Sequence, residues 1–195
     1  MTDISDRVRI EKTEILSDNW YVLRKITFAW RRGDGSWQSS AREAYDRGNG
    51  ATILLYDPAR RTVVLTRQFR MPAYLNGYRD TLIEAAAGLL DDATPEDRIR
   101  HEAEEETGYR VSDPRKIFEA FMSPGSVTEK LHFFVAEYSP ASRAGAGGGL
   151  AEEGEDIAVL ELPFDTAYAM IAGGEIVDAK TILLLQWAKL ELFRP

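Results

Sequence analysis

The order of the candidate secondary-structure elements is the strongest constraint on the fold of this chain. Short runs of apolar and β-branched residues, bounded by Gly, Pro and Asp, are typical of strands, and they fill the first part of the sequence. The first helix signal comes only at Thr94. Strands followed by helices favour an α+β fold over a doubly wound parallel sheet, in which the two alternate. The expected strands are 21–30, 36–45, 51–56, 62–66, 82–87, 117–121, 132–138 and 159–162, and the expected helices are 94–107, 164–172 and 178–193.

Two stretches are expected to be loops. Residues 71–77 combine Pro, Asn and Gly, and residues 139–155 are rich in Gly, Ala, Ser and Glu. The run Gly147-Gly148-Gly149 lacks the Lys-Ser/Thr ending of a phosphate-binding P-loop, so that motif is rejected. The second stretch is therefore predicted to be a long flexible loop, and loops of this length are often functional.

Composition argues against several classes of protein. The 195 residues are 29% charged and 44% hydrophobic, which is ordinary for one globular domain or a domain with a small appendage. No apolar run approaches the ~18 residues of a membrane span, and the N-terminus has no signal-peptide pattern. The absence of cysteine excludes disulfides and thiolate chemistry, so a cytoplasmic location is expected. A net charge of −8 argues against a nucleic-acid partner.

The predicted helix 94–107 carries an unusual concentration of acid. Thr94 suits the N-cap, Pro95 the first helical position and Gly108 the end. Glu102 and Glu106 are four residues apart, so their side chains share one face and repel each other. Arg98 and Arg100, or a metal ion, are expected to compensate. On the residues alone, a solvated acidic face and a divalent-metal site both stay open.

The segment around this helix resembles the signature of the Nudix hydrolases. That signature is a Gly followed, some residues later, by Arg-Glu, an aliphatic residue, any residue, Glu-Glu, any residue and Gly. In this chain Gly88 precedes the run His101-Glu102-Ala103-Glu104-Glu105-Glu106-Thr107-Gly108-Tyr109. His101 replaces the usual Arg and is expected to take its structural role. The middle Glu of the signature is missing, and the spacing from Gly88 to His101 is one residue short.

The resemblance covers nearly the whole chain and is strongest to the branch that cleaves GDP-mannose, which is close to the ADP-ribose pyrophosphatases. The matching segments are 15–20, 45–52, 67–70, 122–125, 127–129 and 180–181. The resemblance implies an N-terminal antiparallel β-subdomain, residues 1–48, followed by a Nudix α/β/α sandwich, residues 49–195. It also implies a homodimer in which the N-terminal subdomains are exchanged.

The same resemblance implies metal-dependent hydrolysis of the pyrophosphate bond of a nucleotide sugar. GDP-mannose, giving GMP and mannose 1-phosphate, is the expected substrate. An ADP-ribose or ADP-sugar pyrophosphatase that releases AMP is the alternative, and a non-catalytic nucleotide-binding module is a remote one. RNA-cap removal is disfavoured by the acidic balance.

The implied cofactor is Mg²⁺, with Mn²⁺ as a substitute. The implied metal ligands are the carbonyl of Ala87 and the carboxylates of Glu102, Glu106 and Glu155. Glu105 is a candidate ligand for a second ion and a candidate catalytic group. Glu155 is implied either as a ligand or as the catalytic base, with Glu152 and Glu153 as nearby rivals in the same loop.

Substrate-binding residues are also carried over from the resemblance. Arginine suits forked contacts with phosphate oxygens and lysine supplies a point charge, while a flat aromatic ring can stack on a base. His132 is expected to be an ordinary packing residue. The implied substrate-binding residues are Trp20, Arg42, Glu43, Arg70, Gly88, Glu129 and Lys180.

Overall fold

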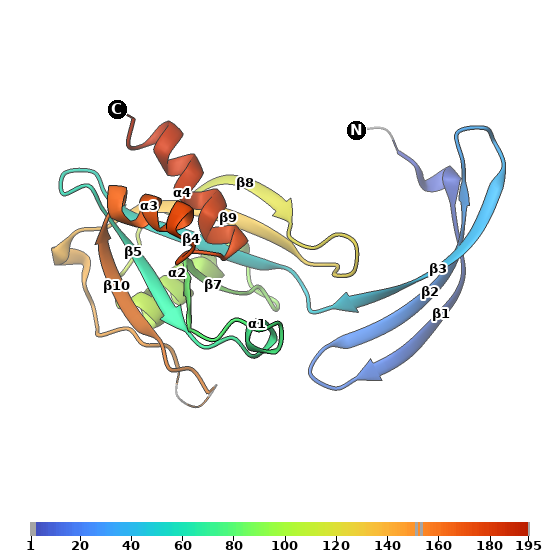
Figure 1. The fold of residues 1–195 in the computed structure, drawn as a ribbon, viewed down its shortest axis with the longest axis horizontal. Helices are drawn as coiled ribbons and strands as arrows, with labels where there is room; N and C mark the ends of the chain where they lie inside the picture. Colours follow the sequence, from blue (N-terminus) through green and yellow to red (C-terminus); the bar gives the residue numbers. More distant parts are fainter. Residues whose placement is uncertain (1–2, 151, 153, 195) are drawn as a thin grey trace. The chain divides into compact units, whose positions relative to one another are not determined.

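The computed structural model describes residues 3–150, 152 and 154–194. The chain forms two compact units (Figure 1). The first contains the residues up to Asn49 together with Phe121–Lys130, and the second contains Gly50–Ala120 and the residues from Leu131 onward. The sequence pattern gave no sign that Phe121–Lys130 would join the first unit.

The first unit is built on a three-stranded antiparallel sheet with the strand order β1-β2-β3. A short 3-10 helix, Ser5–Arg7, precedes it. The first strand was missed by the sequence pattern because charged residues interrupt its alternation, and register shifts follow Ile10 and Ile15. The strands are β1 (Val8–Asp18), β2 (Val22–Arg31) and β3 (Trp37–Asp46).

One face of this sheet is apolar yet open. Val8 pairs with Trp30 and Ile10 pairs with Phe28, so these four side chains share a face. Of the strand residues in this sheet only Ala29 is buried, and Ile10 is 61% exposed. A sheet normally buries its apolar face against another element. In the face made by Val8, Ile10, Phe28 and Trp30, called the β1–β2 face below, Ile10 is exposed and the other three side chains are half-buried.

The second unit contains a seven-stranded mixed sheet. The order β10-β5-β4-β9-β8 is extended by β6, which pairs with β5, and by β7, which pairs with β4. The central strand β4 is parallel to β9 and antiparallel to β5 and β7, and all eight of its residues are buried. The strands are β4 (Gly50–Asp57), β5 (Thr62–Gln68), β6 (Leu82–Glu84), β7 (Ala86–Leu89), β8 (Arg115–Phe121), β9 (Lys130–Glu137) and β10 (Ala158–Pro163).

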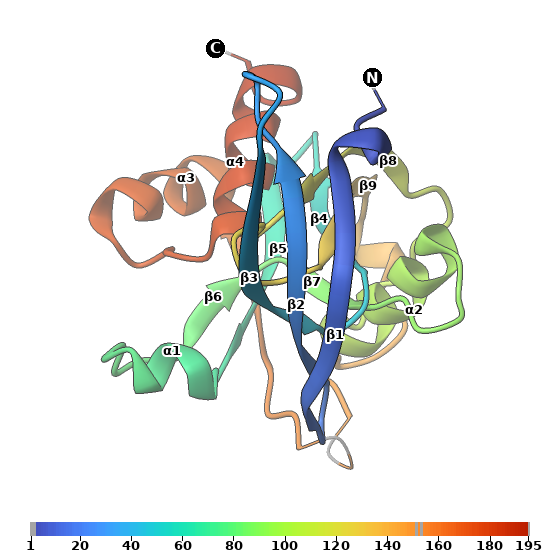
Figure 2. The ribbon, with the colours of Figure 1, turned by 90° about the vertical axis from the view of Figure 1, so that its right-hand side faces the viewer.

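Helices cover both faces of this sheet (Figure 2). Ala51 and Ile53 of β4 belong to the core cluster that also contains Ile99 and Ala103 of α2. On the opposite face α4 packs against β4, and α3 packs against α4. The predicted α/β/α sandwich is therefore confirmed. The helices are α1 (Met71–Leu75), α2 (Pro95–Thr107), α3 (Phe164–Gly173) and α4 (Ala179–Glu191), and Pro140–Ser142 forms a further 3-10 turn.

Two local predictions need correction. Residues 71–75 form the short helix α1 rather than loop, since Pro72 at a first-turn position is compatible with helical backbone. The single strand predicted over 82–87 is broken at Ala85, whose N–H donates to Thr181 Oγ1 at 2.7 Å instead of to a neighbouring strand. Among the described residues, no helix has the length and apolar character needed to cross a bilayer. The cytoplasmic location stays a prediction.

Candidate active site

Helix α2 carries Glu102 and Glu106 into the protein interior. Thr94 caps it by accepting a hydrogen bond from Asp97 N, and Gly108 ends it in the left-handed conformation at φ 77°. Ile99 and Ala103 anchor the helix in the core. Glu102 and Glu106 follow Ile99 by three and seven residues, so they lie on the same stripe of the helix as these anchors. Glu106 is only 2% exposed, and the Glu102 side chain is 12% exposed.

Both glutamates face β7. Ala87 N donates to Glu106 Oε2 at 3.3 Å. A Cβ added at Gly88 would lie 2.0 Å from Glu102 Oε1, so the carboxylate occupies the space that glycine leaves free. The structure thus brings together Ala87, Gly88, Glu102 and Glu106, as the resemblance implied.

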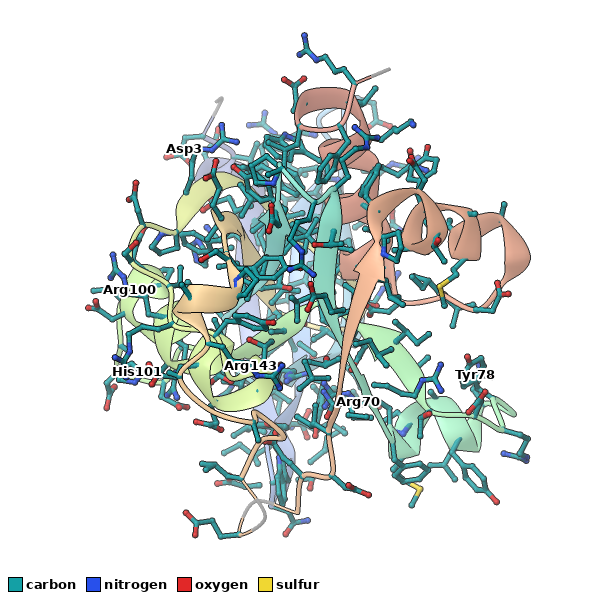
Figure 3. The ribbon with its side chains drawn as sticks, turned by 90° about the vertical axis from the view of Figure 1, so that its left-hand side faces the viewer. Asp3, Arg70, Tyr78, Arg100, His101 and Arg143 are labelled. Atoms are coloured by element: carbon teal, nitrogen blue, oxygen red, sulfur yellow. The ribbon has the colours of Figure 1, made fainter. Side chains whose placement is uncertain are left out.

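Arginine compensates only part of this acidic charge. Arg98 reaches Glu102 Oε1 at 3.4 Å and Asp91 Oδ2 at 2.5 Å. Arg100, the other candidate, instead pairs with Asp97 at 3.2 Å on the outside of the helix. Figure 3 shows Arg100 and His101 pointing outward. His101 is exposed, so its position differs from that of a residue that braces the site from within.

The glycine-rich loop is hydrogen-bonded to the end of α2, and its flexibility stays a prediction. Gly148 N donates to the carbonyl of Glu106 at 2.9 Å, and Gly149 N donates to the carbonyl of Glu105 at 3.2 Å. These donors satisfy carbonyls that the end of a helix leaves without partners. Gly147 has φ 72°, and a Cβ there would lie 2.6 Å from the Glu106 carbonyl. Only glycine allows the two backbones to approach so closely.

This attachment brings Glu155 close to the α2 glutamates. Glu155 Oε2 accepts from Leu150 N at 3.0 Å, and its side chain packs where a Cβ of Gly149 would be. Its negative charge raises the pKa of Glu106, which is consistent with proximity. Glu105 is half-buried and Glu152 is exposed. Glu153 lies outside the described residues.

The donor set suits a hard divalent cation. Three carboxylates, those of Glu102, Glu106 and Glu155, interact electrostatically and have a backbone carbonyl, that of Ala87, at the facing strand. Within the part of the chain that the structure describes, no three acidic, His or Cys side chains already converge on a single point. A bound ion would draw these oxygens together, and the metal itself stays a prediction.

Two implied substrate-binding cations share one partner that the sequence analysis missed. Glu84, at the end of β6, accepts from Arg70 Nε and from Lys180 Nζ, each at 2.9 Å. Lys180 also lies 3.1 Å from Asp178. An acidic residue at a strand end gives no sequence signal of such partners, because Arg70 and Lys180 come from distant segments.

The remaining substrate-binding candidates lie in the first unit. Arg42 and Glu43 line a cavity of about 520 Å³, which residues 124–128 also line. Glu129 pairs with Arg47 at 3.5 Å. Trp20 is 81% exposed, as expected of a ring that is available to another molecule. His132 is half-buried in β9, with its Nδ1 3.3 Å from Glu119 Oε2.

The buried acid predicts how stability depends on pH. Burial, and then the charges of Glu102 and Glu155, raise the pKa of Glu106 from 4.5 to about 8. The folded state therefore holds a proton that the unfolded state releases, and this contribution to stability is present below pH 4.5 and lost as pH rises through about 8. We expect the free energy of unfolding of the metal-free protein to fall over this range, as measured by chemical denaturation in EDTA. Glu106→Gln, which cannot ionise, should flatten this dependence, and identical profiles for the two proteins would contradict the assignment.

Comparison with known proteins places these features in a family. A model described as the GDP-mannose pyrophosphatase NudK N-terminal domain matches residues 7–45. GDP-mannose pyrophosphatase of Pectobacterium atrosepticum is 55% identical over 186 residues, covering 95% of each chain. The Klebsiella pneumoniae protein of the same name is 55% identical over 185 residues, covering 94% of this chain and 92% of its own.

The solved structures agree on the fold. A crystal structure of an ADP compounds hydrolase superposes with a TM-score of 0.70 at 15% identity, covering 95% of this chain and 96% of its own. At that identity the likeness shows the fold alone. The relatives at 55% identity, which align over nearly the whole chain, show the family as well. On this evidence the chain belongs to the NudK family of Nudix pyrophosphatases.

Proposed function

We propose that this enzyme hydrolyses GDP-mannose to GMP and mannose 1-phosphate, with a divalent metal ion as cofactor. Hydrolysis of the pyrophosphate bond of a nucleotide sugar is supported by relatives that are 55% identical over nearly their whole length and carry the name GDP-mannose pyrophosphatase. The observation that carries the chemistry is the pair Glu102 and Glu106, buried on one stripe of α2 and facing Ala87 and Gly88.

We propose Mg²⁺ as the ion, with Mn²⁺ as a substitute. Glu102, Glu106 and the Ala87 carbonyl would hold it, and Glu155 is the further candidate ligand. When bound, the ion supplies charge neutralisation at the pyrophosphate oxygens and lowers the pKa of a water molecule. Such chemistry suits phosphoryl transfer, in which positioning and electrostatic stabilisation supply most of the catalysis.

The chain's own groups supply the rest of the site. Arg70 uses only its Nε toward Glu84 and is 40% exposed, so its terminal nitrogens can face phosphate oxygens. Glu155 accepts a hydrogen bond from Leu150 N and acts electrostatically on Glu106, which supports it as either a metal ligand or the base that takes a proton from water. Glu105 is the further candidate for a second ion.

A homodimer is the proposed assembly. Its support is the β1–β2 face, an apolar sheet surface on which Ile10 is 61% exposed and Val8, Phe28 and Trp30 are only half-buried. Exposed apolar area of this kind marks an interface in a soluble protein. A second copy of the chain is the occupant that the resemblance implies.

The substrate proposal predicts the products of a panel assay. With Mg²⁺, the enzyme should convert GDP-mannose to GMP and mannose 1-phosphate, and cleave GDP-glucose, ADP-ribose and ADP-glucose more slowly, as measured by chromatography of the products. Glu102→Gln should lower kcat by about a hundredfold or more, because a charge-stabilising group is lost. Preference for ADP-ribose with release of AMP would contradict the proposed substrate but support the proposed pyrophosphate hydrolysis.

Gly88→Ala tests the contact between β7 and α2. The new Cβ would lie 2.0 Å from Glu102 Oε1 and push aside the end of a flexible side chain, so the fold should survive while the proposed ligand moves. We expect kcat to fall by about tenfold or more with little change in Tm. Gly33→Ala is the matched control, since nothing lies within 4 Å of a Cβ there. Full activity in Gly88→Ala would argue that Glu102 need not occupy this position.

The dimer proposal predicts the effect of charge on the β1–β2 face. Ile10 is 61% exposed in the single chain, so Ile10→Asp should leave the fold intact but separate the copies. Light scattering after gel filtration should give twice the chain mass for wild type and the chain mass for this variant. Leu190→Asp, at a 66% exposed position of α4, is the control that should stay dimeric. A monomeric wild type would refute the proposal.

A further inference from the structure

Glu84 is a buried carboxylate with two separate cationic partners. It is 3% exposed, its Oε2 accepts from Arg70 Nε at 2.9 Å, and its Oε1 accepts from Lys180 Nζ at 2.9 Å. A buried carboxylate destabilises a protein unless it is paired and hydrogen-bonded, and here both oxygens are used. The two cations arrive from different parts of the fold, one just after β5 and the other in the first turn of α4.

The backbone around Glu84 is held from both sides. Its carbonyl accepts from Thr66 Oγ1 at 3.2 Å on β5. The next residue, Ala85, donates its N–H to Thr181 Oγ1, and Thr181 in turn donates to Asp178 at the cap of α4. The Glu84 carboxylate is therefore held between β5 and α4 by hydrogen bonds of its backbone and of its own oxygens.

The Glu84 carboxylate orients the guanidinium of Arg70 through this hydrogen bond to Nε. Since Nε is the atom engaged by Glu84, the two terminal nitrogens point away from this partner. In the described part of the chain no further side-chain hydrogen bond of Arg70 is found, and the side chain is 40% exposed. Its positive charge lowers the pKa of the Glu106 carboxyl, so the two groups interact electrostatically. A guanidinium held in this way beside Glu106 is suited to forked hydrogen bonds with two oxygens of a diphosphate.

We propose that Glu84 is a positioning residue of the substrate site, and that it acts through Arg70 on the diphosphate group of the substrate. This inference rests on the proposed function, but it concerns the diphosphate that GDP-sugars and ADP-sugars share. Glu84 sets where the Arg70 fork sits, and Lys180 balances the charge of the carboxylate. The diphosphate then meets an arginine that has already lost its side-chain freedom, which improves binding.

The test is a double-mutant cycle on binding, measured by calorimetry with GDP and, in parallel, ADP in the presence of Mg²⁺. The proteins are wild type, Glu84→Gln, Arg70→Ala and the double variant. We expect Glu84→Gln to weaken the affinity for both nucleotides by about tenfold. The double variant should bind no worse than Arg70→Ala, because the effects of coupled residues are not additive. The same factor for both nucleotides is expected since the diphosphate is common to them.

A control and a second variant separate positioning from mere stability. Asp165 also bridges an arginine and a lysine, at 3.4 Å from Arg61 and 3.7 Å from Lys189, outside the proposed site, so Asp165→Asn should bind as wild type does. If Glu84→Gln unfolds in a thermal melt, Arg70→Lys replaces it. That variant keeps the positive charge at a partly exposed position but loses Nε and the forked guanidinium. Its affinity for both nucleotides should be lower than that of wild type.

The outcomes are distinguishable from those of the substrate panel. Wild-type affinity in a folded Glu84→Gln or Arg70→Lys, or losses that add fully in the double variant, would overturn the positioning role. Failure of wild type to cleave GDP-mannose would overturn the proposed substrate and leave this cycle readable, because its readout is binding. Absence of GDP and ADP binding by folded wild type would overturn the positioning role as well.

Discussion

The packing of α2 against β4 and β7 is the interaction on which the site depends. Ile99 and Ala103 fix the helix in the core, and this same stripe carries Glu102 and Glu106 inward. Burying two carboxylates beside each other is unfavourable by itself, as the raised pKa of Glu106 indicates. The core therefore sustains an arrangement that the glutamates alone would oppose, which is common where a protein prepares a site for a ligand.

Small residues make this arrangement sterically possible. Gly88 leaves room for the Glu102 carboxylate, and Gly147 lets the following loop approach the last turn of α2. The loop's N–H groups satisfy the carbonyls of Glu105 and Glu106, and the loop then continues to Glu155. The glycines therefore fix the relative positions of the helix and the loop, whereas their usual association is with flexibility.

The sequence predicted the elements with strong local signals and missed those defined by tertiary contacts. The ends of α2 followed from Thr94 and Gly108, and the Glu102–Glu106 pair followed from helical spacing. The resemblance supplied Gly88, Arg70 and Glu155. Strand β1 was missed because its charged residues hide its alternation, and the attachment of the glycine-rich loop was missed because backbone hydrogen bonds leave no trace in composition.

Glu84 illustrates the same limit at the level of single residues. Its role depends on Arg70 and Lys180, which reach it only after β5, β6 and α4 have packed together. An isolated glutamate in a predicted strand would ordinarily be assigned to a solvent-facing position. Its burial could be seen only once the fold was known.

Direct metal binding tests the central claim that the buried carboxylates of α2 form a divalent-cation site. Mn²⁺ added to the metal-free protein can be followed by electron paramagnetic resonance, without substrate. Wild type should bind Mn²⁺, Glu106→Gln should lose most of that affinity, and Glu104→Gln, whose carboxylate pairs with Arg110 on the outer side of the same helix, should retain it. Equal binding by all three proteins, or no binding by wild type, would contradict the account.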